Sequence, residues 1–263
     1  MKSELMSTGM SAIRRFSKSC IVLVLGRESR PRKIVRGLAC GYRIHVSPAE
    51  NLGYLLGTDE PHLQKIICEY VAAGDTVYDI GANIGYVSLS LARCVGDHGL
   101  VIAFEPVPRN IILFRENIQI NRLTNIRLLE FAVSDRCGEA IIRIAENLSM
   151  ASLVWHQRNP SAIEIAVKTV SIDELVESGD LIYPSFVKID VEGAEGGVLQ
   201  GMRHTLAAAK PTLFVECSEA GRETAWFLLR GLGYRCQLAA TRQWVNDLES
   251  YRHSDFLWLP PDA

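Results

Sequence analysis

The sequence contains no pair of cysteines spaced as C-x-x-C, although it has seven cysteines in 263 residues. An odd number of scattered cysteines without such a pair indicates neither a disulfide framework nor a structural zinc site. Asn147-Leu148-Ser149 matches a glycosylation sequon. Because we find no secretory signal, we interpret that match as chance and expect a reducing, cytoplasmic environment.

A long hydrophobic run is also missing. The apolar stretch 20–25 is far too short to span a bilayer, and no clear small-residue cleavage site follows it. The net charge of −2 and the isoelectric point near 6.3 give no overall signal for binding polyanions. What is present is 48% hydrophobic and 22% charged residues, which suits one α/β domain with a sizeable core.

Residues 1–40 differ from the rest of the chain in their charge. Only Glu4 and Glu28 oppose a group of basic residues there, namely Lys2, Arg14, Arg15, Lys18, Arg27, Arg30, Arg32, Lys33 and Arg36. Such a segment could rest on an anionic membrane surface, where lipid-linked substrates are found, or it could be a solvated, weakly ordered lead-in. We therefore expect a basic N-terminal segment at 1–40 and a single domain at 41–263.

A strand–turn–helix–strand pattern begins at residue 76. Thr76–Ile80 is a β-branched and aromatic run, long enough for a buried parallel strand, and it ends at the glycine-containing turn 81–85. Val101–Phe104 is the second strand, about twenty residues further on, as in nucleotide-binding βαβ units. Glu105 at its end can accept both hydroxyl groups of a ribose. The pattern predicts a pocket for adenosine.

Asp79, close to that turn, distinguishes two classes of cofactor. A dinucleotide site needs three glycines in a G-x-G-x-x-G pattern and no carboxylate beside the pyrophosphate, whereas this turn has only Gly81 and Gly85. S-adenosylmethionine carries an ammonium, a sulfonium and a carboxylate, so an acid complements its cation while free backbone N–H groups serve its carboxylate. We predict an S-adenosylmethionine pocket; the alternative is a βαβ unit without a ligand.

Further strands are expected at 126–133, 186–191, 212–216, 234–239 and 256–259. Five acids lie at or just past the ends of predicted strands, namely Asp79, Glu105, Asp135, Asp190 and Glu216. This is the edge where open parallel sheets bind ligands. Each acid alone could cap the helix that follows, but together they suit a cationic cofactor.

Four segments, VYDIGANIGYVSLSLA, VIAFEPVPRN, AVSD and FVKIDVEGAEGGVLQGM, resemble the FkbM family of S-adenosylmethionine-dependent methyltransferases over roughly residues 55–220. The resemblance implies an α/β class I methyltransferase (Rossmann-like) fold, a seven-stranded, mostly parallel sheet with helices on both faces and an antiparallel last strand. It also implies methyl transfer, mostly to hydroxyl oxygens of sugars or polyketide-derived products.

The resemblance further implies roles for residues at matching positions. The first cofactor motif corresponds to Asp79, Gly81, Asn83 and Gly85. Glu105 corresponds to the acid that binds the ribose. The edge of the adenine is expected at Ser134 and Asp135.

Methyl transfer from a sulfonium is an in-line displacement, so holding the reactants collinear in a dry pocket supplies much of the acceleration. A hydroxyl acceptor must still lose its proton. Lys188, Asp190 and Glu192 share one face if the strand continues, and Lys188 could hold Asp190 ionised. Our hypothesis is that Asp190 or Glu192 is the general base, while the other acid orients the acceptor or the methionine ammonium.

Three alternatives to this hypothesis stay open. Lys188 and Asp190 could form a purely structural ion pair, with Glu192 bonded to helix-start N–H groups. Asp190 with Glu192 or Glu216 could bind Mg²⁺, but scattered oxygen ligands are a weak signal and we expect no metal. His156 could be the base instead, although nothing nearby fixes its partner.

The segment 137–170 should carry acceptor selectivity. Cys137–Ala145 and Ile163–Val170 alternate in polarity and predict an inserted hairpin, with Trp155 and His156 on a loop near the pocket. Residues 171–174 have the S-x-x-E form of a helix capping box, so the acids within it are expected to be structural.

These features predict an O-methyltransferase that acts on a small molecule, a sugar or a lipid-linked glycan, and not on nucleic acid. An RNA methyltransferase is the alternative, but the core lacks a basic stripe and residues 211–219 lack a proline-cysteine nucleophile motif. A non-catalytic S-adenosylmethionine-binding module would not need the acids of the fourth strand. We expect a cytoplasmic protein that could contact the membrane surface through residues 1–40.

Overall fold

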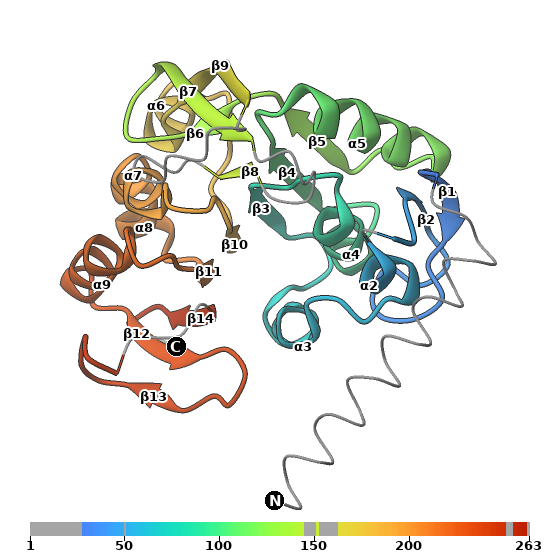
Figure 1. The fold of residues 1–263 in the computed structure, drawn as a ribbon. Coiled ribbons are helices and arrows are strands. Elements are labelled where there is room, and N and C mark those ends of the chain that lie inside the picture. Colours follow the sequence, from blue (N-terminus) through green and yellow to red (C-terminus); the bar gives the residue numbers. More distant parts are fainter. Residues whose placement is uncertain (1–27, 50, 145–150, 153–162, 251–254, 262–263) are drawn as a thin grey trace, which may run out of the picture. The chain divides into compact units, whose positions relative to one another are not determined.

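The computed structural model of the protein describes residues 28–49, 51–144, 151–152, 163–250 and 255–261 (Figure 1). The chain divides into two units, one ending at Asp59 and the other starting at Glu60. This division lies after the boundary at 40/41 that the sequence predicts. Residues 145–150 and 153–162, with the sequon, Trp155 and His156, lie outside the described residues, as do residues 1–27.

The first unit contains a two-stranded antiparallel sheet and a short helix. β1 (Arg30–Lys33) pairs with β2 (Arg43–Val46), and α2 (Leu52–Leu56) follows. The described part of the basic segment is therefore folded, because β1 carries Arg30, Arg32 and Lys33 and pairs with residues beyond 40. α2 ends at Gly57, whose φ of 69° is left-handed, a conformation that favours glycine.

The second unit is built on an eight-stranded sheet with the order β13-β12-β14-β11-β10-β3-β4-β5. In chain order its strands are β3 (Thr76–Ile80), β4 (Leu100–Phe104), β5 (Ile126–Leu129), β10 (Phe186–Ile189), β11 (Thr212–Glu216), β12 (Arg235–Leu238), β13 (Trp244–Val245) and β14 (Asp255–Leu259). β5, β4, β3, β10 and β11 are parallel, whereas β14 is antiparallel to both of its neighbours. The predicted seven-stranded pattern with an antiparallel last strand is confirmed, and the two-residue β13 extends it.

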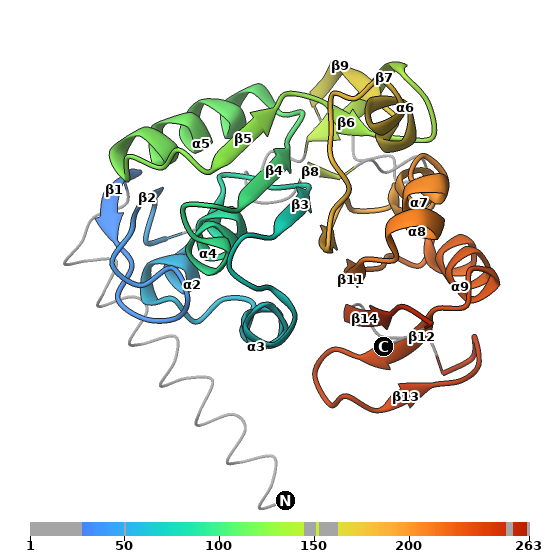
Figure 2. The same ribbon diagram turned by 180° about the vertical axis from the view of Figure 1, so that it is seen from behind.

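Helices cover both faces of this sheet (Figures 1 and 2). They are α3 (Pro61–Tyr70), α4 (Tyr86–Val95), α5 (Pro108–Ile120), α6 (Ile172–Glu177), α7 (Glu195–Gln200), α8 (Arg203–Ala209) and α9 (Arg222–Gly231). On one face Tyr78 and Ile80 pack in a buried apolar core that includes Val198 of α7 and Leu229 of α9. Because side chains alternate along a strand, Asp79 points to the opposite face, which α4 covers.

A smaller sheet with the order β6-β9-β7-β8 is formed by β6 (Ala132–Val133), β7 (Gly138–Ile144), β8 (Ala151–Ser152) and β9 (Ile163–Val170). The predicted hairpin is confirmed, because β7 pairs antiparallel with β9 along its whole length. The predicted strand 126–133 is wrong as one unit. β5 ends at Leu129, and β6 then pairs in parallel with β9, so this pairing draws the chain out of the main sheet.

The capping signal at 171–174 is also confirmed. Ser171 caps α6, since its hydroxyl oxygen accepts the N–H of Glu174 at 3.4 Å. Asp173 accepts the N–H groups of His204 and Thr205 at the start of α8. Glu174 accepts the N–H of Cys137 at 3.3 Å, so both acids of the box connect structural elements.

Two bulk properties can be read from the described residues. Their cysteines are free thiols at positions 40, 68, 94, 137, 217 and 236. None of the helices in the described ranges is long and apolar enough to cross a membrane.

Candidate active site

The turn between β3 and α4 has three residues with left-handed backbone, Gly81 (φ 78°), Asn83 (φ 52°) and Gly85 (φ 90°). A Cβ at Gly81 would lie 1.9 Å from the carbonyl oxygen of Asp190, and one at Gly85 would lie 2.3 Å from the ring of Phe114. The sequence predicts that these glycines make room for a ligand. The structure shows that they let the turn approach β10 and α5, which fixes its position.

Glu105, at the end of β4, lies beneath this turn and is only 4% exposed. Its Oε2 accepts the N–H of Asn83 at 2.8 Å, and its Oε1 accepts the N–H of Val107 at 2.9 Å and the side-chain amide of Asn110 at 3.2 Å. Burial raises the pKa of Glu105, and these hydrogen bonds oppose that rise. A carboxylate has about four acceptor positions, so about one is left for a ribose hydroxyl, fewer than the sequence suggests.

Lys188 compensates two carboxylates at the centre of the sheet. Its Nζ lies 3.3 Å from Oδ1 of Asp79 and 3.1 Å from Oδ2 of Asp190, and it donates a hydrogen bond of 2.8 Å to the carbonyl of Gly81. Lys188 and Asp79 are directly paired in β10 and β3, which places both side chains on one face. Burial lowers the pKa of Lys188, but the two carboxylates outweigh it and keep the pKa above its ordinary value.

This arrangement changes the expected role of Asp79. The carboxylate is 0% exposed, faces Lys188, and accepts the hydroxyl of Ser88 at 2.5 Å. The sequence assigned its charge to the cofactor cation, but the structure pairs that charge with a lysine from another strand. Ser88 was missed, and its position on the buried face of α4 is the only signal that could have pointed to it.

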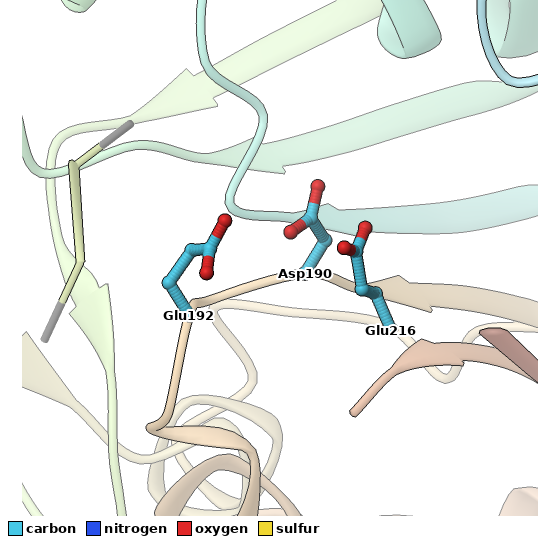
Figure 3. A group of neighbouring side chains, drawn as sticks. All are labelled: Asp190, Glu192 and Glu216. Carbon is cyan, nitrogen blue, oxygen red and sulfur yellow. The ribbon is translucent and has the colours of Figure 1, made fainter. Parts of the chain in front are cut away.

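The carboxyl groups of Asp190, Glu192 and Glu216 gather at the ends of β10 and β11 (Figure 3). Each offers an oxygen within 4.8 Å of the others, and all three residues are half-buried. The predicted continuation of the strand to 192 is wrong, since β10 ends at Ile189 and Glu192 has a φ of 48°. A tight turn, and not strand alternation, brings Glu192 into the group. Acids often lie this close at a protein surface without an ion, although the spacing could accommodate a divalent cation.

Glu195 fixes the two segments that carry these acids. It is 0% exposed, and its carboxylate accepts the N–H groups of Gly193 at 3.0 Å and Ser218 at 3.1 Å, and the hydroxyl of Ser218 at 2.9 Å. The sequence considered Glu192 for bonding N–H groups at the helix start, whereas in the structure Glu195, the first residue of α7, accepts the N–H of Gly193 just before that helix. The second glutamate of the VEGAE block was the signal that sequence reasoning overlooked.

Ser134 and Asp135 follow β6 in the smaller sheet. The N–H of Ser134 bonds to the carbonyl of Val170 at 2.8 Å, and a Cβ at Gly201 would lie 1.9 Å from the carbonyl oxygen of Ser134. Asp135 is exposed and accepts the hydroxyl of Ser134 at 3.1 Å. These contacts lead to the end of α7 and not to the glycine turn, so the adenine role of both residues stays a prediction.

The residues around the turn fit S-adenosylmethionine in chemical character. The N-cap of α4 is Gly85, which has no side chain to cap the helix, so N–H groups of its first turn are left for an anionic group such as a carboxylate. Glu105 retains acceptor capacity for a ribose hydroxyl. The carboxyls of Asp190, Glu192 and Glu216 are the groups that would complement a cation.

The sequence of this chain is similar to those of known methyltransferases. The family model described as the Methyltransferase FkbM domain matches residues 79–242. Hexuronic acid methyltransferase AglP of Haloferax volcanii is 33% identical over 147 residues, which cover 56% of this chain and 58% of the relative. A protein-L-isoaspartate O-methyltransferase of Methanococcoides burtonii is 28% identical over 80 residues, or 30% of this chain and 39% of the relative.

Among solved structures, methyltransferase FkbM from Methylobacillus flagellatus superimposes with a TM-score of 0.45 at 19% identity, covering 81% of this chain and 53% of that one. This chain therefore spans little more than half the length of the AglP and FkbM proteins it matches. The match of the domain over 79–242 takes in the glycine turn, Glu105, Lys188 and the acids of β10 and β11. The chain belongs to the FkbM family of S-adenosylmethionine-dependent methyltransferases.

Proposed function

We propose that the protein transfers a methyl group from S-adenosylmethionine to a hydroxyl oxygen of a sugar, either free in a small molecule or within a glycan. The observation that carries the proposal is the group of carboxyls of Asp190, Glu192 and Glu216 at the carboxyl ends of β10 and β11. A hydroxyl acceptor needs a nearby proton acceptor, and this group supplies one. The relative named for methylating hexuronic acid supports a sugar acceptor.

Each part of the site has a separate task in this reaction. When bound, S-adenosylmethionine supplies an electrophilic methyl group. Glu105 and the turn 81–85 would hold the cofactor. A carboxyl oxygen of Asp190, Glu192 or Glu216 would take the proton of the acceptor hydroxyl. Lys188 holds Asp190 and the carbonyl of Gly81 together, so it keeps the acid in register with the turn.

The same charges argue for a hydroxyl over a carboxylate acceptor. An anionic oxygen would approach three half-buried carboxyls and be repelled, whereas a neutral hydroxyl would not. On a uronic acid we therefore propose an ether at a ring hydroxyl and not a methyl ester. A lipid-linked acceptor, with membrane contact through the basic residues 1–40, remains part of the proposal.

The cofactor site is tested by titrating the protein calorimetrically with S-adenosylmethionine and with NAD. Glu105→Ala should weaken S-adenosylmethionine binding by about 10- to 100-fold, the effect of losing a charged hydrogen bond. Glu139→Ala, at an exposed position of β7, is the control and should bind like the wild type. Preference for NAD, or equal binding by both variants, would contradict the assignment.

The acceptor is tested by transferring labelled methyl groups to uronic acids, neutral sugars, lipid-linked glycans and RNA. Label on a sugar that survives mild alkali indicates the expected ether, and alkali-labile label indicates an ester. Transfer to RNA alone would revive the nucleic-acid alternative. Cofactor binding with no transfer to any acceptor would favour a non-catalytic module.

A further inference from the structure

We propose that Glu216 is the residue that receives the proton of the acceptor hydroxyl, while Asp190 orients the acceptor. The inference deepens the proposed function and rests on it. Sequence reasoning placed the base at Asp190 or Glu192 and left Glu216 without a catalytic role. The acids at β10, β11 and β14 differ in the charges that surround them, and this difference favours Glu216 as the base.

The register of the sheet puts Glu216 between two other acids. Phe214 is paired with Lys188 across β11 and β10, so Glu216, two residues on, shares the face of Lys188 and lies beside Asp190. On its other side Glu216 is directly paired with Asp255 of the antiparallel β14. Directly opposed residues of antiparallel strands place their side chains on the same face, where like charges are unfavourable.

The charge balance differs between Asp190 and Glu216. Asp190 forms an ion pair with Lys188, so its negative charge is compensated. Among the described residues of the second unit, no ion pair involves Glu216. The titratable groups that face it from neighbouring elements are all acids, namely Asp190 and Glu192 after β10, Asp255 of β14 and Glu60 before α3.

Burial and these acids together raise the pKa of Glu216 to about 8. A general base works best when its pKa is close to the working pH. Such a group exchanges a proton near neutrality. The geometry thus separates Glu216, which is surrounded by acids, from Asp190, which is paired with a lysine.

The backbone supports Glu216 more firmly than Glu192. Glu216 is the last residue of β11, and the next turn is tied by the hydrogen bonds of Ser218 to the buried Glu195. Glu192 lies in a turn with left-handed backbone after β10 has ended. A base held on a strand keeps a defined position toward the acceptor.

The step balances as follows. The acceptor oxygen forms a bond to the methyl carbon, and the carbon–sulfur bond of the sulfonium breaks with its electron pair remaining on sulfur. The hydroxyl proton passes to Glu216 Oε, giving a methyl ether, the neutral thioether and a protonated carboxyl. Since Glu216 must be ionised to act, turnover should rise with pH and level off above about 8.

The first test compares pH–rate profiles of the wild type and Glu216→Gln. The variant should lose at least about 100-fold in kcat and the rising limb of the profile, while calorimetry should still detect binding of S-adenosylmethionine. Glu219→Gln, an exposed neighbour on the same loop, is the matched control and should keep the wild-type profile. A Glu216→Gln variant with near-normal kcat and the same limb would overturn the proposal.

A second variant keeps the test decisive if Glu216→Gln folds poorly. Asp255→Asn removes one of the facing charges, so the rising limb should move to lower pH while the plateau stays. An unmoved limb would overturn the assignment. So would Mg²⁺-dependent turnover that Glu216→Gln abolishes, because it would assign the residue to a cation.

A readout without turnover separates this inference from the proposed function. Carbon-13 NMR of the unliganded protein, compared with Glu216→Gln, should show one carboxyl titrating near pH 8 that is absent from the variant. If that carboxyl titrates near its ordinary value of 4.5, the role of Glu216 is wrong even where methyl transfer occurs. If the wild type transfers no methyl group to any hydroxyl, the proposed function fails, whatever the titration shows.

Discussion

The acids in two neighbouring parts of the same sheet edge have different charge partners. Where β3 meets β10, Asp79 and Asp190 share the buried Lys188, and that lysine also bonds to the glycine turn. Where β11 lies between β10 and β14, Glu216 lies among acids and forms no ion pair with a lysine or arginine in the described part of the second unit. The first part therefore pairs its acids with a lysine, whereas in the second part burial and neighbouring acids raise the pKa of Glu216. The difference indicates that acids at one edge of a sheet need not have the same function.

The largest expected effect comes from removing the shared cation. Lys188→Met would leave Asp79, which is 0% exposed, as a buried charge without its lysine, and we expect a loss of about 3–5 kcal/mol in the free energy of unfolding. Urea denaturation measures it. Lys168→Met, at an exposed position of β9, is the control and should change stability by no more than about 0.5 kcal/mol. Adding Asp79→Asn to Lys188→Met should restore part of the loss; equal losses at positions 188 and 168 would contradict the buried ion pairs.

A smaller effect is expected at the turn that Lys188 holds. Gly81→Ala combines a left-handed φ of 78° with a Cβ only 1.9 Å from a backbone oxygen of Asp190. Gly74→Ala has a similar φ of 91° but nothing within 4 Å, so it isolates the backbone penalty of about 1–2 kcal/mol. Gly81→Ala should lose more stability than this and also bind S-adenosylmethionine more weakly. Equal losses, with unchanged cofactor binding, would show that the turn is not fixed against β10.

The smallest effect is expected in the pH dependence of stability that Glu216 causes. The pKa of Glu216 rises from 4.5 in the unfolded chain to about 8 in the folded protein, so the folded state binds more protons between these values. Stability contributed by this group is complete below pH 4.5 and is lost as the pH rises toward 8. Glu216→Gln should flatten the decline only in part, because burial also raises the pKa of Glu105 and of Glu192.

Urea midpoints of the wild type and Glu216→Gln, at about pH 5 and about pH 8.5, measure this slope. We expect the two proteins to differ more at the higher pH, with the variant the more stable. A wild type that gains stability over this range as strongly as the variant does would mean that Glu216 ionises normally.

Much of the fold could be predicted from local patterns. Thr76–Ile80 and Thr212–Glu216 have the bounds that their β-branched and aromatic runs predict, and the hairpin of β7 and β9 follows its alternation. The expected strand 126–133 failed because the run contains no glycine or proline that would mark the break before Ala132. Only the competing partner β9 decides that these two residues join another sheet.

The sequence predicted where several residues of the candidate site lie along the strands, but not all of the contacts between them. Glu105, Asp190 and Glu216 lie, as expected, at or just past the ends of strands of the main sheet. The alternation of the strand pointed to the ion pair of Lys188 with Asp190. It could not show that Lys188 also faces Asp79, because that contact depends on β10 lying beside β3.

The sequence by itself determined the order of elements, the left-handed turn that requires glycine, and the acids near the ends of β3, β4, β10 and β11, since these depend on residues close together in the chain. The tertiary structure decided which acids share the lysine and which acid retains a proton. Those properties depend on strand order and register, which join residues far apart in the chain and set the distances between their charges.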